Sequence, residues 1–189
     1  MELNWTVEIL VLIISSFFIS FASIIAFAHY LKTRHKTFLF FMLSWLNISL
    51  FAFFEALSYL FLSIPLFRFR FYFLILGGFF LIFALDSISR FSIDPFKTTI
   101  FGILSTLLIV FSYLPDAIIP YTFKNGDKSF STQGPLVIIG SVVFALIGVV
   151  FVIYCVDLYI SSPTDIKKWS RLTLIGALIF GLLPTIFYA

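Results

Sequence analysis

Charged residues are scarce in this chain of 189 residues, of which only 11% are Asp, Glu, Lys or Arg and 61% are hydrophobic. Soluble domains typically carry about 25% charged and about 45–50% apolar residues, so these charges are too few to cover a surface that faces water. The single cysteine, Cys155, excludes an internal disulfide and any metal site built from cysteines. These shortages exclude a soluble enzyme and a disulfide-stapled secreted module, and they indicate an integral membrane protein.

Extended runs of one charge sign are also missing. The 12 Lys and Arg residues outnumber the 9 Asp and Glu residues only slightly, and they are scattered in twos and threes. Without a basic face that could follow a phosphate backbone, we expect no nucleic-acid partner. The partner that the composition indicates is the lipid bilayer.

Long apolar runs are abundant instead. A helix needs about 20 apolar residues to cross about 30 Å of hydrocarbon. A β-barrel strand would alternate apolar and polar residues, whereas residues 138–156 are apolar on every face. We therefore predict an all-α fold, a polytopic membrane helical bundle that forms a single transmembrane domain over residues 1–189. Its six predicted transmembrane helices cover residues 7–31, 38–62, 69–88, 98–114, 136–160 and 172–188.

One substantial loop, residues 113–135, separates the fourth and fifth apolar runs. Within it, residues 121–123 and 129–131 flank the segment Lys-Asn-Gly-Asp at 124–127. Asn-Gly is a strong hairpin signal because both turn positions need a positive φ. We predict a small β-hairpin that caps the outer end of the bundle.

The basic residues of the loops are divided unequally between the two sides of the membrane. Alternating loops place eight on one side (Lys32, Arg34, Lys36, Arg90, Lys97, Lys167, Lys168 and Arg171) and four on the other (Arg68, Arg70, Lys124 and Lys128). The positive-inside rule assigns the richer side to the cytoplasm. This predicts a multi-pass protein of the cell membrane with its N-terminus outside. Because the start lacks the basic region of a cleavable signal peptide, we expect the first run to be an anchor.

Glu55 lies among aromatic residues in the outer half of the second predicted helix. A carboxylate at this depth is costly unless it is paired, protonated or facing a cavity. It could bind a ligand or signal, or it could form a structural pair with Arg68 or Arg70 at the outer mouth. The two arginines could themselves attract an anionic ligand, or extend to lipid head groups.

Asn47 begins a glycosylation sequon, but the sequon lies in the middle of a predicted helix and must be accidental. We expect its side chain to form hydrogen bonds between helices, with Ser44 and Ser49 nearby. Asn47, Glu55, Arg68 and Arg70 are therefore the candidate ligand-binding residues.

Signals of catalysis are missing from the sequence. It contains no His-Glu-x-x-His, no Gly-x-Ser-x-Gly and no phosphate loop. The two histidines, His29 and His35, are six residues apart, which does not suit a metal pair on one helix. We expect no enzyme activity, no catalytic residue, no metal and no cofactor. Near the inner end of the third predicted helix, Asp86 and Arg90 are spaced as a favourable helical ion pair.

The segment Phe54-Glu55-Ala56-Leu57, followed after a short gap by Arg68-Phe69-Arg70-Phe71-Tyr72, resembles the seven-transmembrane sensor region found N-terminal to many prokaryotic histidine kinases. That family carries a carboxylate late in its second helix and a short basic and aromatic outer loop before the third. Gly134-Pro135-Leu136 and the basic residues before the sixth run, with Pro184 beyond, resemble it as well. The resemblance implies an N-out sensor whose seventh helix and cytoplasmic effector would follow Ala189.

Together these patterns predict a sensor or receptor domain that transmits an extracellular or intramembrane signal to the cytoplasmic side. A small or amphiphilic ligand would bind near Glu55, Arg70 and the loop 113–135, and the partner would be a second copy or a downstream signalling protein. Two alternatives stay open. A small transporter or channel would need a polar path through the bilayer, and a structural subunit would bind other membrane helices through its apolar faces.

Overall fold

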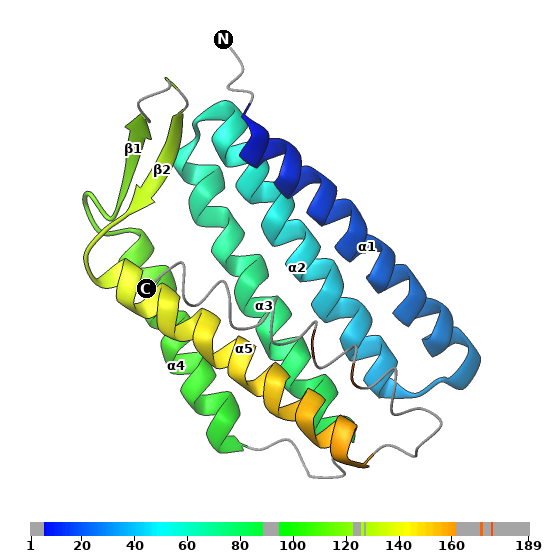
Figure 1. Cartoon of the computed structure of the whole chain (residues 1–189). Helices are drawn as coiled ribbons and strands as arrows, with labels where there is room; N and C mark the ends of the chain where they lie inside the picture. Colours follow the sequence, from blue (N-terminus) through cyan, green and yellow to red (C-terminus); the bar gives the residue numbers. More distant parts are fainter. Residues whose placement is uncertain are drawn as a thin grey trace. The chain divides into compact units, whose positions relative to one another are not determined.

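The computed structural model describes residues 6–88, 95–122, 126, 128–161, 171 and 175. The chain divides after Gln133 into two compact units, and each is described by itself. In the described ranges the elements are five helices and one two-stranded sheet (Figure 1). The first unit contains α1 (Val7–Thr33), α2 (Lys36–Phe61), α3 (Ile64–Ile88), α4 (Pro95–Ser112), β1 (Ile118–Thr122) and β2 (Lys128–Thr132), and the second contains α5 (Pro135–Ser161).

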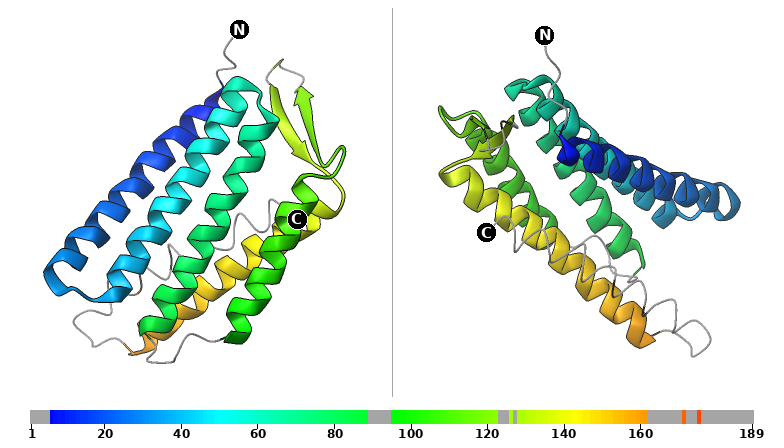
Figure 2. Two further views of the ribbon diagram at one scale, coloured as in Figure 1. Left: turned by 180° about the vertical axis from the view of Figure 1, so that it is seen from behind. Right: turned by 45° about the horizontal axis from the view of Figure 1, so that its top comes forward.

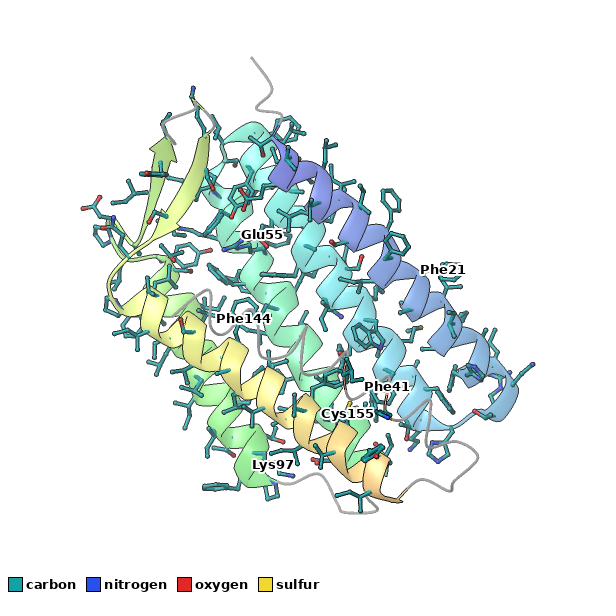
Figure 3. The ribbon with its side chains drawn as sticks, viewed as in Figure 1. Phe21, Phe41, Glu55, Lys97, Phe144 and Cys155 are labelled. Atoms are coloured by element: carbon teal, nitrogen blue, oxygen red, sulfur yellow. The ribbon has the colours of Figure 1, made fainter. Side chains whose placement is uncertain are left out.

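The five described helices are all long and apolar enough to cross a membrane, judged by length and composition. On the outer face of α1, Phe21 points away from the other helices of its unit and is 62% exposed (Figure 3). Exposed large apolar side chains of this kind suit contact with lipid rather than water. The predicted helical architecture is thereby confirmed for these five helices, and their length and composition suit a multi-pass membrane protein. The sixth predicted helix, 172–188, lies outside the described residues apart from Ile175, and the N-out orientation stays a prediction.

Helices α1, α2 and α3 pack side by side, with α2 in the middle (Figures 1 and 2). Each chain reversal is short because a residue in the left-handed conformation ends the preceding helix. Arg34 ends α1 at φ 54°, and Leu62 ends α2 at φ 49°. Such C-caps satisfy carbonyl groups of the last turn and redirect the chain at once.

Serine hydroxyl groups join α1 to α2. Ser16 Oγ donates to the Ser49 carbonyl oxygen at 3.1 Å, and Ser49 Oγ donates to the Ser16 carbonyl oxygen at 2.9 Å. One turn along α1, Ser20 Oγ lies 2.6 Å from Ser49 Oγ, and Ser23 Oγ donates to the Met42 carbonyl oxygen at 2.9 Å. Small polar residues allow membrane helices to approach closely and hydrogen-bond, so this row fixes the position of α1 along α2.

A close approach between α2 and α3 occurs at Gly77. A Cβ atom added there would lie 3.0 Å from Ile48 Cγ1 and 3.4 Å from the Ser44 carbonyl oxygen. Ser44 Oγ donates to the Gly77 carbonyl oxygen at 2.9 Å at the same point. The absent side chain and this hydrogen bond together hold the two helices at a short separation.

Helix α3 begins at Ile64, earlier than the predicted start at residue 69. Ser63 precedes it and accepts a hydrogen bond from the Leu66 amide at 3.5 Å through its hydroxyl oxygen. Pro65 lies in the first turn, where a missing backbone N–H group is tolerated. The early start makes the segment of Arg68 and Arg70 helical, so their side chains diverge by about 200° around the axis.

The predicted β-hairpin is present. β1 and β2 pair antiparallel, with Ile118 opposite Thr132 and Thr122 opposite Lys128. Gly126, in the predicted turn, has a φ of 91°. β2 packs against α2, and we call this part of the first unit, where α2 ends and α3 begins, the hairpin end.

The second unit is described mainly through α5. The helix has 27 residues and begins at Pro135, because proline fits the first helical position without losing a hydrogen bond. Gly134, just before it, has a φ of 60°, a conformation that glycine adopts without strain.

Candidate functional site

A buried ion pair joins α2 to α3 near the hairpin end. Arg70 Nη1 donates to Glu55 Oε1, and the two side chains are only 4% and 5% exposed. Tyr59, one turn further along α2, donates its hydroxyl group to the same oxygen atom at 3.2 Å. Glu55 lies in the part of α2 nearest the hairpin (Figure 3). Of the two partners predicted for Glu55, the structure therefore selects Arg70.

Aromatic rings surround the guanidinium group of Arg70. Its Cζ atom lies 3.6 Å from the ring centroid of Phe67, 5.1 Å from that of Phe71 and 5.4 Å from that of Phe51. The faces of aromatic rings carry partial negative charge and attract cations. The rings therefore replace part of the hydration that the guanidinium group loses on burial.

The hairpin covers this aromatic surface with one side chain. The ring centroid of Phe130, on β2, lies 5.0 Å from that of Phe67 and 6.1 Å from that of Tyr59. Phe130 itself is 8% exposed. Because Tyr59 and Phe67 also contact the ion pair, Phe130 lies over the two rings that hold it.

Helical spacing explains how the sequence assembles this site. On α2, Glu55 and Tyr59 are four residues apart and share one buried face. On α3, Phe67, Arg70 and Phe71 are spaced at three and four residues and form the matching face. The site therefore depends on the register between two neighbouring helices.

Arg68 lies elsewhere, since the early start of α3 turns it away from Arg70. Its Cζ atom lies 4.9 Å from the ring centroid of Tyr113, just after α4. In the part of the chain that the structure describes, Arg68 forms no ion pair or hydrogen bond. Arg68 and Arg70, two residues apart in the sequence, thus belong to different surroundings.

Asn47 is also separate from the ion pair. It lies eight residues before Glu55 on α2, about 12 Å along the helix axis at 1.5 Å per residue. Its amide nitrogen donates to the Leu43 carbonyl oxygen of its own helix at 2.7 Å, whereas we expected hydrogen bonds between helices. The shorter side chains of Ser44 and Ser49 make those bonds instead, and the amide satisfies itself one turn back, as polar side chains in helices often do.

A second ion pair lies near the other end of α3. Asp86 is buried, and one of its carboxylate oxygens is 3.5 Å from Nζ of the half-exposed Lys97 at the start of α4. The predicted partner, Arg90, lies outside the described residues. This contact joins α3 to α4 across the connection between them. Among the described residues, no group of three His, Cys, Asp or Glu side chains could hold a metal ion.

Tyr59, Phe67 and Phe130 are the site residues that the sequence reasoning missed. The spacing of Tyr59 from Glu55 was a usable signal, because residues four apart on a helix are neighbours. Phe67 lies in a segment that the sequence predicts to be a loop. The sequence around Phe130 does not indicate its position, because Phe130 lies on β2, which begins more than fifty residues after the start of α3.

Protein-family models, curated proteins and solved structures give no match to this chain. The resemblance to histidine kinase sensor regions therefore stays a prediction. The function has to be argued from the chemistry of the site itself.

Proposed function

We propose that this chain is an integral membrane sensor domain whose ligand site is the Glu55–Arg70 pair at the hairpin end. The observation that carries the proposal is the burial of both charges between two membrane helices. Ionisable groups within membrane segments are rare and mostly functional. The same residues also carry the family resemblance described above.

Stability alone gives little reason for such a pair. Removing two charges from water costs about as much as their attraction returns, and apolar replacements of a buried pair are often neutral or stabilising. An ion pair differs from apolar packing in that a charged ligand can compete for either partner. This property suits a site that must change state when a ligand arrives.

The charges of the site favour a ligand with a zwitterionic head group and an apolar tail. A head group with one charge would replace one partner and leave the other buried without compensation, which is strongly unfavourable. A head group with both charges can bind Arg70 through its anion and Glu55 through its cation. The rings of Phe67 and Phe71 would contact the apolar part.

Entry of the ligand requires Phe130 to move off Tyr59 and Phe67. The hairpin that carries Phe130 has only two strands of five residues, and isolated sheets of this size are marginally stable. Displacing it would cost little compared with opening the helices. The hairpin is therefore the element through which the ligand would enter.

The helix contacts suggest how binding would reach the other end. The close contact of Ser44 with Gly77 fixes the crossing of α2 and α3. A ligand that separates Glu55 from Arg70 on one side of this contact would tilt α3 relative to α2 on the other side. Such a ligand shifts the equilibrium only if it prefers one of the two arrangements.

The experiment uses amphiphiles that share a twelve-carbon tail and differ in the head group. The chain in lipid nanodiscs is heated with dodecyl betaine, dodecanoate or dodecyltrimethylammonium, and the unfolding midpoint is recorded. We expect the betaine to raise the midpoint in a concentration-dependent way, because a ligand that binds only the folded state stabilises it. The two singly charged amphiphiles should raise it less.

Three variants show whether the effect arises at the ion pair. Glu55→Gln and Arg70→Gln should abolish the betaine effect. Arg34→Gln, a matched change of an exposed arginine that also lies over an aromatic ring, should retain it. An equal betaine effect in wild type and Glu55→Gln would refute the assignment of this site.

A further inference from the structure

Arg68 has an unusual combination of burial and contacts. Its side chain is half-buried, and its Nε atom is buried and donates to no partner among the described residues. Its described contact is with a ring, at 4.9 Å from Cζ to the centroid of Tyr113. A guanidinium group is always charged and carries five N–H donors. The contact with Tyr113 orients this group but leaves its two terminal Nη atoms available as donors to an anion.

Two tyrosines lie beside Arg68. Tyr72 is one turn further along α3, and the side chain of Tyr113 lies near its hydroxyl group. Both rings are exposed, Tyr113 to 56%. The three side chains therefore form one exposed corner between the start of α3 and the end of α4, which we call the Arg68 corner.

The position of the Arg68 corner along the helices suits a membrane–water interface. Tyr113 follows directly after Ser112, the last residue of α4, and Arg68 lies in the second turn of α3. Tyrosines are enriched where membrane helices leave the hydrocarbon, at the level of the head groups. At that depth the commonest anion is the lipid phosphate.

We propose that the Arg68 corner, formed by Arg68, Tyr72 and Tyr113, binds a phosphate group, which a lipid head group supplies. The planar guanidinium fork matches the oxygen atoms of a phosphate in a bidentate arrangement. The tyrosine hydroxyl groups add neutral donors next to it. This site is separate from the Glu55–Arg70 pair and does not depend on the function proposed for that pair.

Native mass spectrometry of the whole chain released from detergent micelles tests the proposal. Dioleoylphosphatidylglycerol is titrated against dioleoylglycerol, which has the same tails without the phosphate, and inorganic phosphate is added in a third series. We expect wild type to prefer the phospholipid. Arg68→Gln should lower the phospholipid affinity about tenfold and leave binding of dioleoylglycerol unchanged.

Arg34→Gln is the matched control, since Arg34 also lies over a tyrosine ring, at 5.9 Å, but is exposed at the end of α1. It should bind the phospholipid as wild type does. Tyr113→Phe removes only a hydroxyl group from an exposed ring and should lower the affinity about threefold, which keeps the test valid if Arg68→Gln fails to fold.

Displacement of the phospholipid by inorganic phosphate would assign the same chemistry to a free anion and overturn the lipid as its source. Equal phospholipid affinity in wild type, Arg68→Gln and Tyr113→Phe would overturn the site altogether. An equal loss in Arg34→Gln would do the same, because it would show a general effect of positive charge.

Discussion

Removing one partner of the buried ion pair should be far more damaging than removing both. In Arg70→Met the carboxylate of Glu55 stays buried with the Tyr59 hydroxyl group as its remaining described donor. Leaving one charge of a buried pair uncompensated costs about 3–5 kcal/mol. The variant also loses the contact of the guanidinium group with the Phe67 ring, which is worth about 0.5–2 kcal/mol.

The double variant Glu55→Gln/Arg70→Met removes both charges and keeps the volume of the side chains. The amide oxygen of the introduced glutamine would still accept the hydrogen bond from Tyr59, and methionine packs well against aromatic rings. Because apolar replacement of a buried pair is often close to neutral, we expect the double variant to lie within about 1 kcal/mol of wild type. Arg70→Met alone should cost at least about 3 kcal/mol and the double variant at most about 1 kcal/mol, so the coupling energy of the cycle should be at least about 2 kcal/mol in magnitude. Independent sites couple by no more than about 0.5 kcal/mol.

The assay is reversible unfolding in dodecyl maltoside micelles with increasing dodecyl sulfate, followed by circular dichroism. Arg68→Met is the matched single variant, because Arg68 is half-buried and forms no ion pair within the described ranges. It should cost less than Arg70→Met. Additive single costs, with no recovery in the double variant, would refute the buried pair as an energetic unit.

Three further predictions concern the packing around the pair. Gly77→Ala should destabilise the chain by about 1–3 kcal/mol through overpacking. At Gly102 an added Cβ atom would meet its nearest neighbour at 3.8 Å, so Gly102→Ala should be neutral or stabilising by up to about 1 kcal/mol. Unfolding in dodecyl sulfate compares the two variants. Ser49→Ala should cost about 1 kcal/mol in the same assay, since it removes hydrogen bonds between α1 and α2. Phe130→Ala should release the hairpin and speed tryptic cleavage after Lys128, measured by mass spectrometry against wild type; unchanged cleavage would contradict the packing of Phe130.

The sequence was informative about the helices because apolar length follows directly from the thickness of the bilayer. It was less informative where a helix begins. The prediction placed Pro65 and Arg68 before the third helix, although proline fits a first helical turn and Ser63 caps the helix. This one boundary decided whether Arg68 and Arg70 share a face.

The candidate site, too, was predictable from the sequence only in part. Glu55 was recognisable because a carboxylate among aromatic residues is costly in a membrane, and Arg70 was one of its two predicted partners. The choice between the partners needed the register of α3 against α2. Phe130 could not be found from the sequence, because a long-range contact leaves no local pattern. The side chain of Asn47 forms its hydrogen bond within its own helix, since a carbonyl group one turn back is nearer than those of other helices.

The most direct test of the proposed sensing mechanism measures whether a ligand at the Glu55–Arg70 pair changes the opposite end of the helices. Spin labels are placed at Lys36→Cys and Ile88→Cys, the first residue of α2 and the last of α3, after Cys155→Ser removes the single native cysteine. Dipolar EPR spectroscopy in nanodiscs then records the distance between the labels with and without dodecyl betaine. A shift in the distance distribution that Glu55→Gln abolishes is the predicted result. An unchanged distribution while the betaine binds at the pair would contradict transmission through α2 and α3.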